Sequence, residues 1–174
     1  KTAYEISTRD WSSDVCSSDL LLLRGARQVG KTYAVRELGK TFSSFIEINF
    51  EVEKEARLLF NKNLDPHRII QEIEAMLDQR IIPGQTLLFF DEIQVVPDAL
   101  TALRYFYEKV PQLHVIAAGS LLDFAIQQVG VPVGRVQFMY MYPMSFIEFL
   151  AAMGHLMLIQ EIVTHQVQIG RAHV

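Results

Sequence analysis

Residues 25–32 read Gly25-Ala26-Arg27-Gln28-Val29-Gly30-Lys31-Thr32 and fit the pattern G-x-x-x-x-G-K-[ST]. An apolar run precedes them and an amphipathic stretch follows, as a strand and a helix would. The two glycines let the backbone wrap around phosphate groups, whose charge is met by consecutive N–H groups and by the start of the helix. We therefore predict a phosphate-binding loop in which Lys31 reaches the β- and γ-phosphates and the hydroxyl of Thr32 faces Mg²⁺. The alternative is an ordinary glycine turn with a solvated lysine.

A second signal is the apolar run at residues 87–90, which ends in Asp91 and Glu92. Open α/β sheets bind ligands at the carboxyl ends of their strands, so both acids are expected at a ligand site. We predict that Asp91 holds Mg²⁺, directly or through water, and that Glu92 polarises the attacking water as general base. Taken alone, such a pair also fits a strand that ends in a solvated turn. Its place two strand–helix units after Lys31 favours the functional interpretation.

Three further polar residues are weaker candidates. Ser120 follows the apolar run at residues 114–118, and it either senses the γ-phosphate and positions water or serves as a helix N-cap. Arg135 is the best candidate for an arginine that acts on the γ-phosphate, from the same chain or across a subunit interface. A solvated arginine at a strand edge is the alternative for Arg135, and Arg27 inside the loop leaves the same choice open.

The whole chain alternates short apolar runs with longer amphipathic stretches, which predicts an α/β fold. The runs are nearly all apolar, as parallel strands buried on both faces should be. We predict strands at residues 20–24, 45–50, 86–91, 114–118 and 136–142. We predict helices at residues 31–38, 52–61, 66–80, 98–110 and 121–129.

Residues 136–159 are apolar enough to suggest a membrane span, which needs about 20 apolar residues. Pro143 interrupts this run, and Ser145 with Glu148 forms the capping-box pattern that begins a helix. A strand, a turn and a helix therefore fit better than a membrane span, and we expect no membrane partner.

Composition bounds the remaining possibilities. The chain has 174 residues, about one domain's length, and half are hydrophobic. Its net charge of -4 excludes a generally basic nucleic-acid coat protein, although not a local basic patch. The aromatic residues 105–107 lie on a predicted helix, where core packing is favoured over stacking on nucleic acid.

The one cysteine is Cys16, so residues 21–167 need no oxidising compartment and a cytoplasmic location is the simplest expectation.

The two ends differ from the middle in character. Residues 1–20 contain the one Trp and the one Cys and show neither helical nor strand periodicity. Back-translation of residues 10–20 and 168–174 gives an inverted pair typical of translated sequencing adapter, so we expect residues 1–20 and 168–174 to be non-native. A serine-rich disordered tail is the alternative for the amino-terminal segment. We expect residues 21–167 to be an internal fragment of a larger protein.

Four segments together resemble the prokaryotic AAA-type ATPases of the P-loop superfamily, in which an ATPase domain precedes a small helical or winged-helix region and a nuclease-like domain of unknown function. These segments are GARQVGKT, LLFFDEIQ, VIAAGSLLDF and GRVQFMYMYPMSFIEFL. The resemblance implies a P-loop NTPase fold, a sheet of order 5-1-4-3-2 between helices, a Walker A motif at residues 25–32 and a Walker B motif at Asp91 and Glu92. It further implies a sensor at Ser120, an ATPase domain at residues 21–143 and the start of a helical lid at residues 144–167.

The leading hypothesis is therefore an ATP hydrolase that uses ATP and Mg²⁺. The alternative is a slow nucleotide switch that recruits a protein or DNA partner with little turnover. A small-molecule kinase is disfavoured, because the sequence shows no acceptor site and the paired acids suit water as the nucleophile. The preference for adenine over guanine follows from the resemblance, which also leaves room for a homo-oligomer and for a protein or DNA partner bound through a C-terminal domain.

Overall fold

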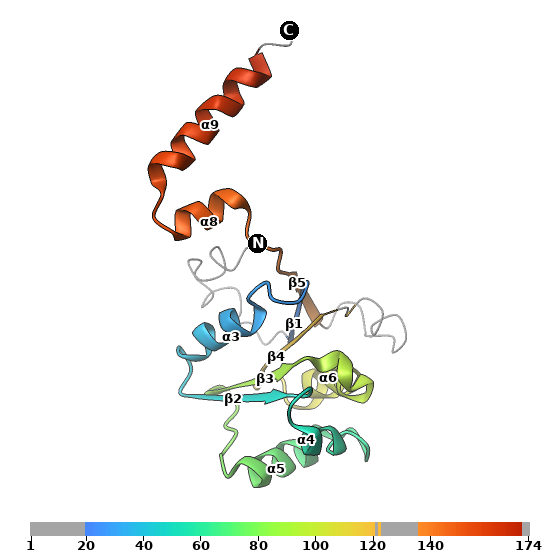
Figure 1. Ribbon diagram of the computed structural model, residues 1–174. Coiled ribbons are helices and arrows are strands. Elements are labelled where there is room, and N and C mark those ends of the chain that lie inside the picture. Colours follow the sequence, from blue (N-terminus) through green and yellow to red (C-terminus); the bar gives the residue numbers. More distant parts are fainter. Residues whose placement is uncertain (1–19, 121, 123–135, 172–174) are drawn as a thin grey trace.

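The computed structural model describes residues 20–120, 122 and 136–171, and its strands form one parallel sheet (Figure 1). The order across the sheet is β2-β3-β4-β1-β5. Read from the other edge this is 5-1-4-3-2, so the predicted α/β fold and strand order are confirmed. The strands are β1 Leu20–Arg24, β2 Ser44–Asn49, β3 Thr86–Asp91, β4 His114–Gly119 and β5 Val136–Tyr140.

Helices follow most of the strands, close to the predicted positions. They are α3 Lys31–Gly39, α4 Lys54–Leu58, α5 Pro66–Leu77, the 3-10 helix η1 Ile93–Val95, α6 Pro97–Lys109, α8 Phe146–Ala152 and α9 Leu156–Arg171. The prediction that α5 runs to residue 80 is wrong, because Asp78 takes a left-handed conformation with φ 51° and ends the helix. α4 is shorter than predicted, since it begins only at Lys54. The helix predicted at residues 121–129 lies outside the described residues, apart from Leu122.

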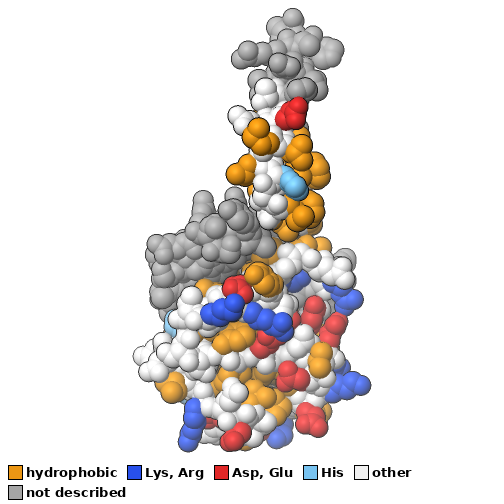
Figure 2. Space-filling view, turned by 60° about the vertical axis from the view of Figure 1, so that its left-hand side comes forward, with side chains coloured by type: hydrophobic (Ala, Val, Ile, Leu, Met, Phe, Trp, Pro, Cys, Tyr) orange, Lys and Arg blue, Asp and Glu red, His pale blue; other side chains and the backbone are white. Residues whose placement is uncertain are grey.

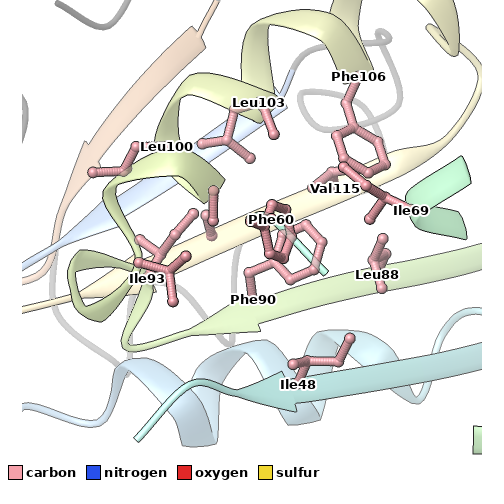
Figure 3. Packing of buried hydrophobic residues seen from close by; sticks show 14 of the residues in the cluster. Ile48, Phe60, Ile69, Leu88, Phe90, Ile93, Leu100, Leu103, Phe106 and Val115 are labelled. Carbon is pink, nitrogen blue, oxygen red and sulfur yellow. The ribbon is translucent and has the colours of Figure 1, made fainter. Parts of the chain in front are cut away.

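The sheet separates two apolar layers, and alternate residues of each central strand supply them. Leu87 and Phe89 of β3 face α3, whereas Leu88 and Phe90 face the helices on the other side. Figure 3 shows the larger layer, where Phe90 lies close to Phe60 and Phe106. Every residue of β3 is consequently buried, and the strand is held from both faces.

The chain leaves the sheet after β5 and forms two helices. α8 begins with the predicted capping box, in which the Ser145 side chain accepts a hydrogen bond from the Glu148 N–H and the Glu148 carboxylate accepts one from the Ser145 N–H. α9 projects away from the sheet and carries exposed apolar side chains (Figures 1 and 2). Within the part of the chain that the structure describes, no helix is long and apolar enough to cross a membrane.

Candidate functional site

The parallel sheet brings the carboxyl ends of its strands to one edge. In the β2–β3 register Asn49 lies beside Asp91, and in the β1–β4 register Arg24 lies beside Gly119. The segments that follow β1, β3 and β4 therefore start next to one another. The loop at residues 25–30, the Asp91-Glu92 pair and Ser120 meet there, as the sequence predicts.

The loop between β1 and α3 depends on backbone conformations that favour glycine. Gly30, directly before α3, has φ 96°, and the non-glycine Gln28 also adopts a left-handed φ of 63°. Gly25 is required by close packing, because a Cβ there would lie 2.3 Å from the carbonyl oxygen of Met141. The loop therefore turns sharply enough to bring its N–H groups and the amino end of α3 to one side, which is a cradle for anions.

Lys31 is held beneath this loop. Its side chain is 6 % exposed, and Nζ donates hydrogen bonds to the carbonyl oxygens of Gly25 at 3.0 Å and Ala26 at 2.7 Å. Burial lowers the pKa of Lys31, the carboxylates of Glu92 and Asp91 oppose that change, and the nearby Arg27 adds to it. A buried ammonium group whose charge is only partly balanced favours the binding of an anionic ligand.

Asp91 and Thr32 form the pair that the sequence assigns to a metal. Thr32 Oγ1 donates a hydrogen bond of 2.9 Å to Asp91 Oδ2, and Asn49 Nδ2 donates one of 3.2 Å to the same oxygen. Burial raises the pKa of Asp91, and the hydrogen bond from Thr32 opposes that change. Hydroxyl and carboxylate oxygens are ligands that Mg²⁺ prefers, and it commonly takes one or two protein ligands and fills its other positions with phosphate and water. The residues present therefore fit this ion.

Glu92 lies one residue beyond β3 in a left-handed conformation, with φ 51° and ψ 44°. This conformation is sparsely populated for residues other than glycine and is concentrated at functional sites. The N–H of Glu92 donates to Asp91 Oδ1 at 3.0 Å. The sharp turn separates the two adjacent acids, so that Asp91 lies next to Thr32 while the Glu92 carboxylate lies next to Ser120.

Ser120 is buried at the end of β4 and contacts two predicted site residues. Its Oγ donates to Glu92 Oε2 at 3.4 Å and accepts from Arg27 Nε at 3.4 Å. Arg27 also forms an ion pair with Glu51, with Nη2 2.7 Å from Oε1. Ser120 therefore links the loop to Glu92. Its alternative role as an N-cap concerns a helix outside the described residues, and Arg135 lies outside them as well.

Comparison with known proteins identifies the family of this chain. A model of the AAA domain family matches residues 17–150. The chain belongs to the AAA domain family. Among solved structures, the structure of C. elegans PCH-2 matches with a TM-score of 0.50 at 14 % identity, over 92 % of this chain and 44 % of that one. The chain therefore spans less than half the length of PCH-2, and at this identity the likeness concerns the fold. A comparison with curated proteins finds no match.

Membership of the AAA domain family supports a nucleotide-binding, ATPase-type function. The structure brings together the residues that the sequence singled out, apart from Arg135, which it does not describe. Within the described residues no three His, Cys, Asp or Glu side chains gather into a group that could hold a metal ion.

Sequence reasoning missed two residues of this AAA domain site. Asn49 hydrogen-bonds to Asp91, and Gln94 hydrogen-bonds to Glu92. Asn49 could have been found, because it is a polar residue at the carboxyl end of a strand, the same rule that identified Asp91. Gln94 is harder to find, because it reaches the site only through the left-handed turn at Glu92.

Proposed function

We propose that this AAA domain binds ATP with Mg²⁺ and hydrolyses its terminal phosphoric anhydride bond. One observation carries the proposal: a buried lysine, a hydroxyl–carboxylate pair and a second carboxylate with a separate set of contacts meet beside one phosphate-binding loop. Nucleotide binding alone accounts for Lys31 and for the Thr32–Asp91 pair. A second carboxylate held apart from the first is what hydrolysis requires in addition.

The loop at residues 25–30 and Lys31 bind the phosphates of ATP. The loop N–H groups donate hydrogen bonds to the phosphate oxygens, and Nζ of Lys31 reaches the β- and γ-phosphates from a position already fixed by two carbonyl oxygens. Thr32 and Asp91, which are already joined by a hydrogen bond, would hold Mg²⁺. When bound, the ion neutralises charge that develops on the phosphate oxygens.

Glu92 serves as the general base. Ser120 and Gln94 both contact Oε2 of its carboxylate, and among the described residues Oε1 has no hydrogen bond. A water molecule that lies between Oε1 and the γ-phosphate can therefore transfer a proton to Glu92 as its oxygen attacks phosphorus. Arg27 Nε lies 3.4 Å from Ser120 Oγ, which in turn contacts Glu92. We assign Arg27 to the γ-phosphate, and we keep the same role for Arg135 as a prediction from the sequence, since Arg135 lies outside the described residues.

The test is phosphate release from Mg-ATP together with ATP affinity. Glu92→Gln should lower phosphate release by about 100-fold or more, the usual contribution of a general base, and should retain ATP binding. Lys31→Ala should weaken ATP affinity by about tenfold or more, because charge-assisted hydrogen bonds to phosphate are lost. Glu55→Gln is the matched control, since it makes the same change at an exposed position of α4.

The outcomes separate the two hypotheses from the sequence. Turnover that the Glu92→Gln substitution abolishes while ATP stays bound supports hydrolysis. Tight ATP binding without turnover in the wild type would instead indicate the nucleotide switch. Equal phosphate release by wild type and Glu92→Gln would remove Glu92 as the base, and a folded protein that binds no ATP would contradict the assignment of the loop.

We also propose that residues 144–167, which include α8 and most of α9, begin a helical lid over the nucleotide. The capping box fixes the start of α8 at Phe146, soon after β5, whose neighbour β1 leads into the phosphate-binding loop. Amide hydrogen exchange of residues 146–152 should therefore slow when ATP binds. Unchanged exchange at saturating ATP would contradict a lid role for α8.

A further inference from the structure

Gln94 contacts the proposed base from the far side of a turn. It is the second residue of η1, which starts immediately after the left-handed Glu92. This turn returns the chain, so that Gln94 Nε2 donates a hydrogen bond of 2.5 Å to Glu92 Oε2 and lies 3.5 Å from Ser120 Oγ. The buried neighbour Ile93 anchors η1 in the larger apolar layer (Figure 3).

The other end of the same amide is in an unusual environment. Oε1 of Gln94 is buried and has no hydrogen-bond partner among the described residues. It lies against Gly119, where an added Cβ would come within 2.1 Å of it. A buried acceptor without a partner opposes folding, so its presence calls for a compensating interaction.

The charge of Glu92 supplies that compensation. If the amide were reversed, Oε1 would face the carboxylate oxygen at hydrogen-bond distance and the two acceptors would repel each other. The orientation with Nε2 toward Glu92 therefore keeps the strong, charge-assisted hydrogen bond and leaves Oε1 of Gln94 without a hydrogen-bond partner among the described residues. Gly119 provides the space that this orientation needs, because it has no side chain.

We propose that Gln94 is a positioning residue that fixes the Glu92 carboxylate for proton transfer from water. This inference rests on the proposed hydrolase function. The hydrogen bond to Oε2 fixes the rotamer of Glu92 and directs Oε1 toward the attacking water. Ser120 contacts the same oxygen of Glu92 and supports this orientation. Among the described residues, the side-chain hydrogen bonds of Gln94 go to Glu92 and Ser120 and not to the loop, Lys31, Thr32 or Asp91. Gln94 therefore acts on the catalytic step and not on nucleotide binding.

The first experiment separates kcat from KM. Gln94→Ala should lower kcat by about 10- to 100-fold, the cost of a misplaced catalytic group, and leave KM and ATP affinity within about twofold. Gln94→Glu should lower kcat further, because it places a second carboxylate beside Glu92. Gln71→Ala removes the same amide from an exposed position of α5 and should leave both constants unchanged. In a Glu92→Gln background, Gln94→Ala should cause no further loss.

A second variant perturbs the same contact from the opposite side. Gly119→Ala keeps every site side chain but pushes Oε1 of Gln94 from its place. We expect a fall in kcat in the same direction, and we expect Gly119→Ala to add little to a protein that already carries Gln94→Ala. Because Gly119→Ala and Gln94→Ala perturb the same contact, the inference stays testable if one of the two variants is destabilised. Urea unfolding of each variant shows whether it is destabilised.

The nucleotide-free protein provides a readout that does not depend on turnover. The side-chain amide resonance of Gln94, identified by its loss in Gln94→Ala, should shift in Glu92→Gln and stay in place in Glu55→Gln. A wild type without phosphate release overturns the proposed function. A wild type with normal turnover, Gln94→Ala kinetics equal to it and a resonance insensitive to Glu92→Gln overturn the inference about Gln94 alone.

Discussion

β3 and β5 belong to the same parallel sheet, yet they are buried to very different extents. All six residues of β3 are buried, whereas Gln137, Phe138 and Tyr140 of β5 are exposed. β3 lies between β2 and β4, whereas β5 pairs with β1 and is last in the order of the sheet. Asp91 ends the strand that packing holds from both faces and Glu92 follows it directly, which fixes their positions without help from a ligand.

β5 serves the site in a different way. It contributes backbone: the N–H of Met141, just past the strand, donates a 2.7 Å hydrogen bond to the Arg24 carbonyl oxygen, and the Met141 carbonyl oxygen packs against Gly25. Side chains on its exposed face can change without disturbing these contacts. The comparison therefore predicts large effects of substitution in β3 and small effects on the exposed face of β5 and in the helices that follow it.

The largest effect is expected for Phe90→Ala in β3. The Phe90 ring lies 5.6 Å from the Phe50 ring, 5.9 Å from Phe60 and 6.0 Å from Phe106, measured between ring centres. Removal of a buried aromatic ring costs about 3–5 kcal/mol. Urea unfolding should show this loss, and ATP affinity should fall with it because Asp91 follows directly. A loss below about 1 kcal/mol would mean that the layer around β3 can collapse and is less rigid than its burial indicates.

Asp91→Asn should act in the opposite direction on stability. Burial raises the pKa of Asp91, so the folded state holds this proton more tightly than the unfolded chain does. The carboxyl group therefore favours folding below its ordinary pKa, and that contribution is lost as pH rises through the folded pKa. At pH 7 the buried charge opposes folding, and Asn should raise the free energy of unfolding by about 1.5 kcal/mol, a typical gain where a site sacrifices stability for function.

The pH dependence is the control for Asp91→Asn. The gain should be present at pH 7 and shrink toward zero as the pH falls below the ordinary pKa of an aspartate, because both proteins are then uncharged at this position in the folded and the unfolded state. The same variant should lose the response of ATP binding to Mg²⁺. A loss of stability at pH 7 would show that the hydrogen bonds from Thr32 and the Glu92 N–H outweigh the cost of the buried charge.

Phe138→Ala tests the same aromatic residue type on β5. The ring is 38 % exposed, and the Arg24 guanidinium carbon lies 4.0 Å from its centre. A cation–π contact at such a position contributes about 1 kcal/mol. Urea unfolding should therefore show a loss of about 1 kcal/mol, well below that of Phe90→Ala. Equal losses for the two variants would remove the distinction between the strands.

The same contrast explains how much the sequence could predict. The runs that became β1 and β3 were placed residue for residue, because strands buried on both faces are apolar throughout and end at a clear polar boundary. β5 was predicted to reach residue 142 and to be buried, whereas it ends at Tyr140 and is largely exposed. Apolar character alone does not reveal that a strand lies at the edge of a sheet, since the partner strands come from distant parts of the chain.

The site residues also differ in how far the sequence predicts them. Lys31, Thr32 and Asp91 follow from local patterns whose geometry is set by one loop and one strand end. Gln94 depends on a left-handed residue, on an opposing glycine in another strand and on the charge of Glu92. Gln94 ends the segment LLFFDEIQ that carries the family resemblance, but the sequence of that segment does not show that its side chain contacts Glu92. Residues that reach a site through tertiary contacts require the structure.

The smallest effect is expected at the far end of the chain from β3. Met157 on α9 is 81 % exposed, so replacing it with lysine removes little buried surface and should change the free energy of unfolding by less than about 0.5 kcal/mol. The measurement needs the same urea series as Phe90→Ala, at two protein concentrations. Exposed apolar residues are common on α9, including Leu156 and Leu158. A loss above about 2 kcal/mol that shrinks on dilution would show that this face is covered by another copy in solution, because dilution removes the stabilisation that association gives the wild type, whereas a contact within one chain is independent of concentration.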